Sequence, residues 1–243
     1  MARKRVVLVE DDASLRRFVA MALEEFDIEL VQCTSVAHAV AELQAQPAHL
    51  VITDLMMPGE SGLVLIERLR RDPGLGAGAQ LAVFSAGLTE PVRAQLAGLG
   101  IWRFLAKPVS IHELERCVLD ALALPSPRAV AATPLPDVSA PSAAERAVVR
   151  HFGGNKALYE AFQAACQIQF PNDITAGDSA AQASDWPALR RVAHSLKSVL
   201  FMLGHDKAAR MARALEDHCA AFPEPGNARA LWADLRNALL RLV

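Results

Sequence analysis

Five polar residues in the first half of the chain have types and spacing that suit one kind of chemistry. Each lies at or just beyond the end of a short apolar run, and they are Glu10, Asp11, Asp54, Ser85 and Lys107. Carboxylates that lie close together repel one another unless a cation lies among them, and oxygen ligands with room for water suit Mg²⁺. Such a site can bring an anionic phosphoryl group up to a carboxylate nucleophile, while an ammonium and a hydroxyl bind the phosphoryl oxygens.

A histidine in the second half, His194, is the other candidate for chemistry. Segment 185–203 has an apolar stripe at helical spacing: Leu189, Val192, Ala193, Leu196, Leu200 and Leu203. At about 100° per residue, His194 lies roughly 140° from the centre of this stripe, so we expect its imidazole to face water. An exposed imidazole is a nucleophile near neutral pH. Lys197, one turn further on, can contact a phosphoryl oxygen, and the small Ser198 leaves room for another protein.

Alternating strands and helices position the residues of the first half. Apolar runs predict strands at 6–9, 28–32, 50–53, 81–84 and 102–105, and amphipathic segments follow each of them. Five βα units in a row predict a doubly wound parallel sheet whose site lies at the carboxyl ends of the strands. The Lys107–Pro108 bond is a candidate cis peptide that would direct the lysine into that site.

A proline-rich stretch separates this half from a helical one. Five of the 14 prolines fall in 124–142, which predicts a semi-extended linker. Segments rich in Ala, Leu and Arg follow it and predict an all-helical bundle, with helices near 155–170, 172–183, 185–203, 205–221 and 226–242. We therefore expect domains at 1–123 and 143–243.

The composition excludes several classes of protein. The 243 residues carry 25 basic and 27 acidic side chains, so bulk attraction to nucleic acid or to an anionic membrane is not expected. The apolar runs fall short of the roughly 18–20 residues that a membrane span needs. The four cysteines are widely spaced and no secretion signal is evident, which predicts reduced thiols and a cytoplasmic protein.

The first half resembles the response-regulator receiver domain over about residues 4–122. Four motifs carry the resemblance, in the family's order and at its separations: VLVEDD, VITDLMMPGESG, VFSA and FLAKP. The resemblance implies a flavodoxin-like fold and Mg²⁺ as cofactor. It also implies Asp54 as phosphoacceptor, Asp11 as direct metal ligand, Glu10 as a ligand through water, and the carbonyl of Met56 as a further ligand. Ser85 and Phe104 take the positions of the switch hydroxyl and the switch aromatic, and Lys107 that of the family's lysine.

The second half resembles a histidine-containing phosphotransfer (Hpt) domain over about residues 145–241. The resemblance rests on FGGNKAL, on DWPALRRVAHSLK, on Gly204 and on the pair Leu215-Glu216. It implies a four-helix bundle with His194 as phosphocarrier and Lys197 as its electrostatic partner. The family usually has Gly where Ser198 stands, and the aromatic Phe201 on the same face suggests a docking patch made by these two residues.

Together these features predict a phosphorelay protein. Asp54 would accept a phosphoryl group from a sensor histidine kinase, and His194 would exchange it with a receiver of this or another chain. No ATP-binding motif is present, so no kinase activity that uses ATP is expected. Two alternatives remain. The bundle can be an output or dimerisation module gated by Asp54, or a DNA-binding module, although its half carries only 13 basic against 11 acidic residues.

Overall fold

The computed structural model describes residues 3–76, 78–86, 90–123, 142–221 and 227–243. The chain divides into two compact units between residues 135 and 136. This division falls within the linker predicted at 124–142, a segment that lies outside the described residues except for Ser142. The two units are described separately below.

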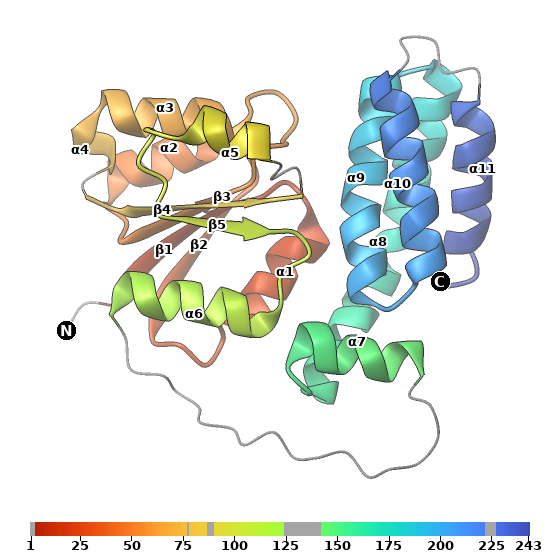
Figure 1. The fold of residues 1–243 in the computed structure, drawn as a ribbon, viewed down its shortest axis with the longest axis horizontal. Coiled ribbons are helices and arrows are strands. Elements are labelled where there is room, and N and C mark those ends of the chain that lie inside the picture. The colour runs from red at the N-terminus through yellow and green to blue at the C-terminus, as the bar shows by residue number, and fades with distance from the viewer. Residues whose placement is uncertain (1–2, 77, 87–89, 124–141, 222–226) are drawn as a thin grey trace. The chain divides into compact units, whose positions relative to one another are not determined.

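The N-terminal unit is built on one parallel sheet of five strands in the order β2-β1-β3-β4-β5 (Figure 1). The register places Val9 of β1 opposite both Cys33 of β2 and Thr53 of β3, so these strands end at one level. The strands are β1 (Lys4–Val9), β2 (Ile28–Cys33), β3 (Leu50–Thr53), β4 (Gln80–Ser85) and β5 (Arg103–Ala106). The predicted α/β class is confirmed.

Helices cover both faces of this sheet, with α1 and α6 on one side and α2, α3 and α5 on the other (Figure 1). Both faces of the sheet are therefore buried, which explains why the strands read as continuous apolar runs. Val7 and Val9 face the core under α2 and α3, where Leu65 and Ile66 pack against them. The helices are α1 (Ala13–Ala22), α2 (Val36–Ala45), α3 (Gly62–Arg71), the short α4 (Pro73–Gly76), α5 (Glu90–Leu96) and α6 (Ile111–Leu122).

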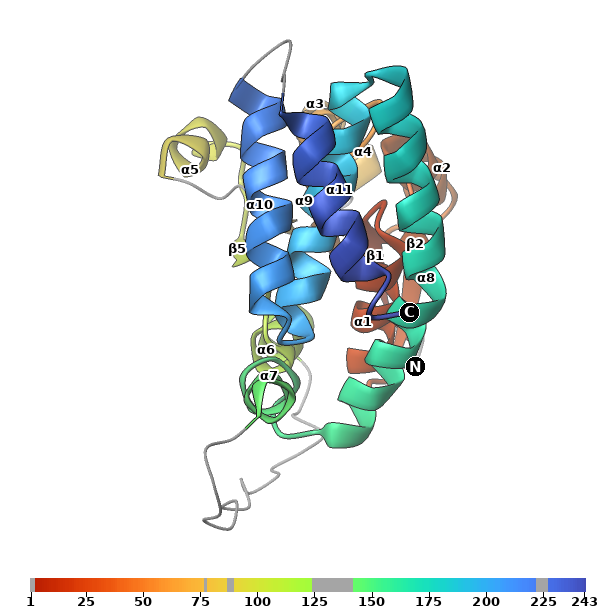
Figure 2. The same cartoon turned by 90° about the vertical axis from the view of Figure 1, so that its right-hand side faces the viewer.

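The C-terminal unit is a four-helix bundle with an additional short helix. Figure 2 shows α8, α9, α10 and α11 running alongside one another, and each helix packs against the next to close a ring. The side chains of Phe162, Leu196, Leu215 and Leu235 are almost fully buried in it. The helices are α7 (Ala143–Phe152), α8 (Lys156–Ala183), α9 (Trp186–Met202), α10 (Asp206–Ala221) and α11 (Ala228–Leu239).

Two features of this unit differ from the sequence-based expectation. The segments predicted as separate helices at 155–170 and 172–183 form the single helix α8, with Pro171 inside it. Proline normally interrupts a helix, but packing against α9 and α11 holds both halves of α8 in line, and the Thr175 hydroxyl donates to the carbonyl of Pro171. Helix α7 was not predicted as an element, although Ser142 and Glu145 form a capping box at its start.

Within the described residues, no helix is both long enough and apolar enough to cross a membrane.

Candidate functional site

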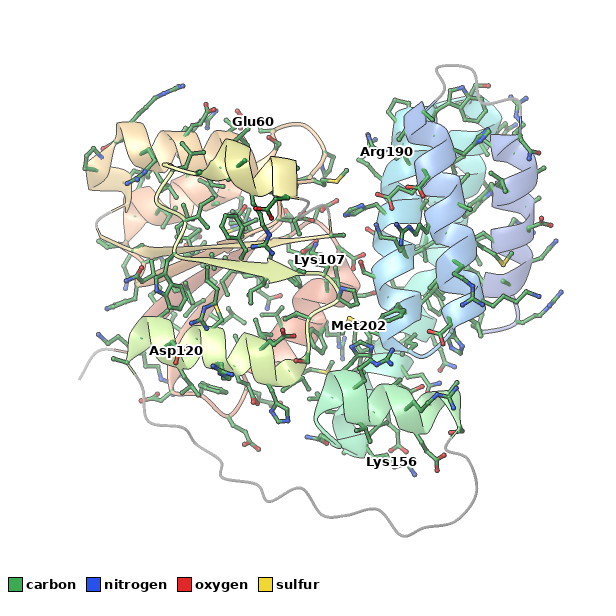
Figure 3. The ribbon with its side chains drawn as sticks, in the orientation of Figure 1. Glu60, Lys107, Asp120, Lys156, Arg190 and Met202 are labelled. Carbon is green, nitrogen blue, oxygen red and sulfur yellow. The ribbon has the colours of Figure 1, made fainter. Side chains whose placement is uncertain are left out.

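The predicted acidic site forms at the carboxyl edge of the sheet. Glu10 and Asp11 follow β1, Asp54 follows β3, Ser85 is the last residue of β4, and Lys107 follows β5. Parallel strands in this order bring these ends together, and Figure 3 shows Lys107 at that edge. The Lys107–Pro108 peptide is cis, as predicted.

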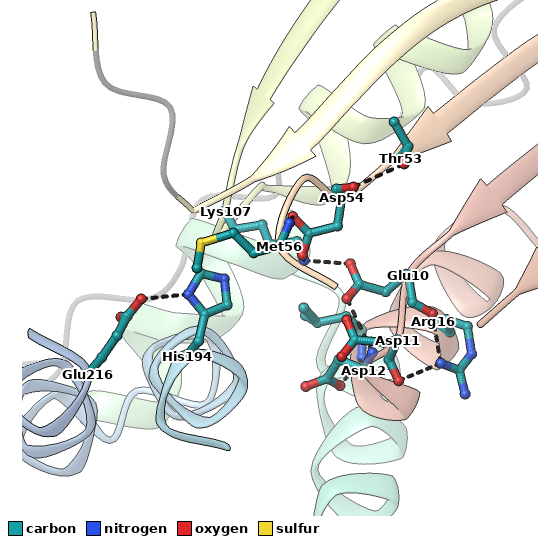
Figure 4. Close-up of polar contacts among 11 residues, drawn as sticks. Glu10, Asp11, Asp12, Arg16, Thr53, Asp54, Met56, Lys107, His194 and Glu216 are labelled. Carbon is teal, nitrogen blue, oxygen red and sulfur yellow. Dashed lines mark hydrogen bonds and ion pairs between the residues drawn. The ribbon is translucent and has the colours of Figure 1, made fainter. Parts of the chain in front are cut away.

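Lys107 is the centre of a buried ion-pair cluster. Its Nζ lies 2.6 Å from Oδ2 of Asp54 and 2.5 Å from Oε2 of Glu10, and all three side chains are about 1% exposed (Figure 4). The ammonium donates a hydrogen bond to Asp54. Oε2 of Glu10, equally buried, is bound by the same ammonium as an ion pair. One cation therefore serves two buried carboxylates.

Burial dominates the electrostatics of this cluster. It raises the pKa of Glu10 to about 8, more than the neighbouring Lys107 lowers it. Burial also raises the pKa of Asp11, which is half-buried. For Lys107, burial alone acts to lower the pKa, but the charges of Glu10 and Asp54 outweigh it and raise the pKa above its ordinary value. The site thus stabilises the charged form of Lys107. It holds too little positive charge to do the same for the carboxylates of Glu10 and Asp11.

The residues present fit a divalent cation. Ligand oxygens of Glu10, Asp11 and Asp54 lie within 4.8 Å of one another. One ammonium, that of Lys107, pairs with Glu10 and Asp54, and a cation with oxygen ligands would offset the remaining negative charge of the three carboxylates. An all-oxygen set of three carboxylates favours Mg²⁺ over zinc, which prefers nitrogen and sulfur ligands.

The Asp54 carboxylate is oriented by its neighbours. The backbone N–H of the half-buried Met56 donates to its Oδ1 at 3.0 Å, which leaves Oδ2 to Lys107. The hydroxyl of Thr53 donates to its backbone carbonyl. Helix α3 begins directly against that carbonyl, because a Cβ at Gly62 would lie 1.8 Å from the Asp54 oxygen. Only glycine permits this approach.

Ser85 and Phe104, the residues predicted to form the switch, lie on the neighbouring strands β4 and β5. Ser85 is fully buried at the end of β4, and its Oγ has no hydrogen-bond partner among the described residues. Phe104 on β5 is half-buried, and the guanidinium of Arg93 on α5 lies 4.9 Å from its ring centre. This cation–π contact joins α5 to β5 in place of the hydrogen bond that a tyrosine hydroxyl would supply.

In the C-terminal unit, His194 is paired with an acid on the neighbouring helix. Its Nδ1 lies 2.6 Å from Oε1 of Glu216 on α10 (Figure 4). The other carboxylate oxygen lies 2.5 Å from Nζ of Lys197. Although burial alone would raise it, hydrogen bonds from His194 and Lys197 lower the pKa of Glu216 to about 2. An ionised carboxylate only accepts, so Nδ1 carries a proton, and in the neutral ring the lone pair is on Nε2.

We expected His194 to face water, but its Nδ1 is held by Glu216 of α10, so this edge of the ring is not open. The prediction used the apolar stripe of α9 alone. Helix α10 packs closely along α9 and brings Glu216 to the side that we took to be open. Nε2 of His194 has no hydrogen-bond partner within the part of the chain that the structure describes.

The predicted docking residues Ser198 and Phe201 both lie on α9. Phe201 is half-buried: its ring lies edge-on to His151 at 5.2 Å, and the guanidinium of Arg150 lies 5.9 Å from its centre. Both partners belong to α7, the helix that the sequence analysis did not identify. A docking role for Ser198 and Phe201 stays a prediction.

Family models match the two units separately. The model described as "Response regulator receiver domain" matches residues 6–119, and the model described as "Hpt domain" matches residues 159–243. The chain carries a receiver domain followed by an Hpt domain. The Hpt match begins within α8, so α7 lies outside it.

Curated relatives share one or both of these domains. The phosphate regulon transcriptional regulatory protein PhoB of Pseudomonas aeruginosa is 31% identical over 47% of this chain and 49% of its own length. The sensory/regulatory protein RpfC of Xanthomonas campestris pv. campestris is 29% identical over 83% of this chain and 29% of its own. The chain thus spans about half or less of the length of these relatives.

Solved structures match the receiver half. The signal receiver domain of a LuxO repressor protein from Vibrio parahaemolyticus is 22% identical and covers 50% of this chain and 92% of its own, with a TM-score of 0.46. A response regulator from Chloroflexus aurantiacus is 23% identical and covers 51% of this chain and all of its own, with a TM-score of 0.47.

Sequence reasoning missed two residues of these sites. Glu216 was noted only as part of a motif, and no spacing rule pairs it with His194, because the contact joins two helices. Arg16, whose contacts with the acidic turn are described below, was not noted. Its one available signal was its place on the first turns of α1, directly after the acids.

Proposed function

We propose that this protein is a phosphorelay component. The receiver accepts a phosphoryl group on Asp54 from the phosphohistidine of a sensor histidine kinase, and His194 of the Hpt domain exchanges a phosphoryl group with a receiver. The observation that carries the proposal is the ion pair between Asp54 and Lys107 beside the acids of β1, since it holds a carboxylate nucleophile next to a cation. The Hpt domain adds a second nucleophile, the imidazole of His194.

The chemistry at Asp54 is a transfer between two nucleophiles. The carboxylate oxygen forms a bond to phosphorus as the bond from phosphorus to the imidazole nitrogen of the donor breaks, and the imidazole leaves with the electron pair and takes up a proton. Lys107, already 2.6 Å from Asp54, can bind an equatorial phosphoryl oxygen. The unpartnered Ser85 hydroxyl can donate to another.

Mg²⁺ belongs to this proposal as cofactor. Glu10, Asp11, Asp54 and the carbonyl of Met56 would hold it, and its chemistry there is to offset the negative charge of carboxylates and phosphoryl group. The fit rests on the clustered ligand oxygens and on the excess of carboxylates over ammonium groups in the cluster. Without the cation, Lys107 alone balances two buried carboxylates.

At His194 the reactive atom is Nε2. When Nε2 bonds to phosphorus, the bond to the aspartyl oxygen of the donor breaks and the ring gains positive charge. The ionised Glu216, 2.6 Å from Nδ1, holds the Nδ1 proton and offsets that charge. Lys197 is kept within one turn of His194 by the same carboxylate, where it can bind a phosphoryl oxygen.

The ion pair between His194 and Glu216 can also serve only to hold α9 against α10, which gives a second candidate function. The Hpt domain would then be an output or partner-binding module that responds to phosphorylation of Asp54 and carries no phosphoryl group itself.

The partners in this proposal are a sensor histidine kinase and another receiver or Hpt protein, and the two domains of this chain can also be partners. The linker predicted at 124–142 permits such contact. We propose a cytoplasmic setting, in keeping with four free cysteine thiols. We expect phosphorylation to alter the surface formed by α5, β5 and α6 through Ser85 and Phe104.

Phosphoryl labelling of the full chain separates the two candidates. Wild type, Asp54→Asn and His194→Gln are incubated with Mg²⁺ and a small-molecule phosphodonor, with the exposed Asp27→Asn and the half-buried His205→Gln as matched controls. Label is sorted into base-labile acyl phosphate and acid-labile phosphohistidine. We expect acyl phosphate in every variant except Asp54→Asn, and phosphohistidine on His194 when a phosphorylated receiver is the donor.

If Asp54 is labelled and His194 never is, with any receiver or kinase as donor, the output-module reading holds. If Asp54→Asn is labelled as strongly as wild type, the receiver does not act through Asp54 and the proposed function fails.

A further inference from the structure

Arg16 on α1 contacts the turn that carries the acidic residues. A single nitrogen of its guanidinium, Nη1, donates to the backbone carbonyls of Glu10 at 2.8 Å and of Asp11 at 2.7 Å (Figure 4). Arg16 is half-buried, whereas its neighbour Arg17 is exposed. Two adjacent arginines on one helix therefore have different surroundings, and one of them is bound to the metal-ligand segment.

These contacts are made to the backbone and not to the carboxylates. Arg16 forms no ion pair with an acid among the described residues, so its function in the turn is not to neutralise charge. Figure 4 shows its guanidinium on the side of Glu10 that faces away from Asp54 and Lys107. The two carbonyls are thus drawn towards α1, while the Glu10 carboxylate lies on the opposite side with Lys107.

The rest of the turn is anchored by side chains. Asp12 caps α1 by accepting from the N–H of Leu15 at 2.9 Å, and its own N–H donates to Oε1 of Glu10 at 3.2 Å. Asp11 lies between these anchors, and its backbone carbonyl accepts a hydrogen bond from Arg16. The direction of the Asp11 side chain therefore depends on the peptide that Arg16 fixes.

We propose that Arg16 is a positioning residue for the cation site of the receiver. By binding two consecutive carbonyls, it holds the turn so that the carboxylates of Glu10 and Asp11 remain within reach of Asp54 before a cation arrives. Without it, the three carboxylates repel one another and the turn, free to relax, moves the first two apart. The proposal rests on the proposed function, because it assumes that the site binds Mg²⁺.

The test is a calorimetric Mg²⁺ titration of the full chain. It compares wild type with Arg16→Ala and Arg16→Lys, and Arg17→Ala serves as the control that removes the same charge from the next residue. Residues that orient metal ligands typically contribute roughly 10- to 100-fold to affinity. We expect Arg16→Ala to weaken Mg²⁺ binding by about that factor, Arg16→Lys to recover part of it, and Arg17→Ala to bind like wild type.

Thermal unfolding without Mg²⁺ distinguishes positioning from a general structural role. A general role lowers the unfolding temperature of Arg16→Ala but leaves the Mg²⁺ affinity of its folded molecules equal to that of Arg17→Ala, and this result would overturn the proposal. If Arg16→Ala does not fold, Arg16→Lys and Arg16→Gln take its place with the same criterion. Failure of wild type itself to bind Mg²⁺ or to label Asp54 would instead contradict the proposed function, so the two failures are distinguishable.

Discussion

The carboxylate of Glu216 joins His194 and Lys197, two residues one helical turn apart on α9, from the neighbouring helix α10. One oxygen lies 2.6 Å from Nδ1 of His194 and the other 2.5 Å from Nζ of Lys197. This arrangement determines which imidazole nitrogen holds the proton and where the ammonium lies. The reactivity of the Hpt domain is therefore a property of two packed helices.

Replacing Glu216 by glutamine should slow phosphoryl transfer to His194. The amide preserves shape but loses the negative charge that holds the Nδ1 proton, and a hydrogen bond to a charged group contributes about 1.5–3 kcal/mol. We expect the rate to fall on the order of 10- to 100-fold, measured with a phosphorylated receiver as donor. The matched control is the neighbouring Asp217→Asn, whose side chain is 70% exposed. Equal rates in both variants would remove Glu216 from the mechanism.

Glu216 should also make the stability of the bundle depend on pH in the acidic range. Its pKa in the folded protein is about 2, below the ordinary 4.5, so the folded state binds this proton more weakly than the unfolded state. The carboxylate therefore contributes stability that is fully present above pH 4.5 and is lost as the pH falls through about 2. Urea midpoints of wild type and Glu216→Gln should converge as the pH falls through this window. If the difference between the two urea midpoints stays constant down to about pH 2, the pKa of Glu216 is not about 2.

Gly62→Ala should destabilise the receiver. The added Cβ would lie 1.8 Å from the carbonyl oxygen of Asp54, so α3 or β3 must move. Overpacking of this kind costs about 1–3 kcal/mol, and here it also displaces the backbone of the phosphoacceptor. Denaturant unfolding measures the first effect and phosphoryl labelling of Asp54 the second. Gly76→Ala is the control, because its Cβ would meet its nearest atom at 3.4 Å.

Helix α7 should prove essential to the bundle although it lies outside the Hpt family match. Phe152 at its end is 1% exposed and packs against the rings of Tyr159 and Phe162. We expect Phe152→Ala to lower the free energy of unfolding by about 3–5 kcal/mol. Val149→Ala on the same helix, where the side chain is 54% exposed, should change it by less than about 0.5 kcal/mol. Similar effects of the two changes would mean that α7 is only loosely attached.

Much of the receiver could be predicted from its sequence. Its strands are buried on both faces, so each appears as an apolar run, and the polar residue after each run must lie at the same edge of a parallel sheet. Asp54 and Lys107 were identified in this way, and they form an ion pair. Strand order alone is enough to predict that Asp54 and Lys107 lie close together.

The Hpt site could be predicted only in part. Helical periodicity locates His194 on one helix, but it does not tell which face of α9 the next helix covers. The Glu216 contact depends on how α9 and α10 pack, and the half-burial of Phe201 depends on α7. The role of Arg16 could not be predicted for another reason: its partners are backbone carbonyls, which have no sequence signature.

The residues of the acidic site come from the ends of β1, β3, β4 and β5, and Lys107 is the last of them to be synthesised. A nascent chain that has reached only β4 holds the carboxylates without their ammonium. The edge strand β5 must then pair with β4 before the lysine reaches Asp54. If Asp54 is the phosphoacceptor, phosphoryl acceptance requires the completed sheet. We therefore expect a truncated or partly folded receiver not to take phosphoryl groups from a relay.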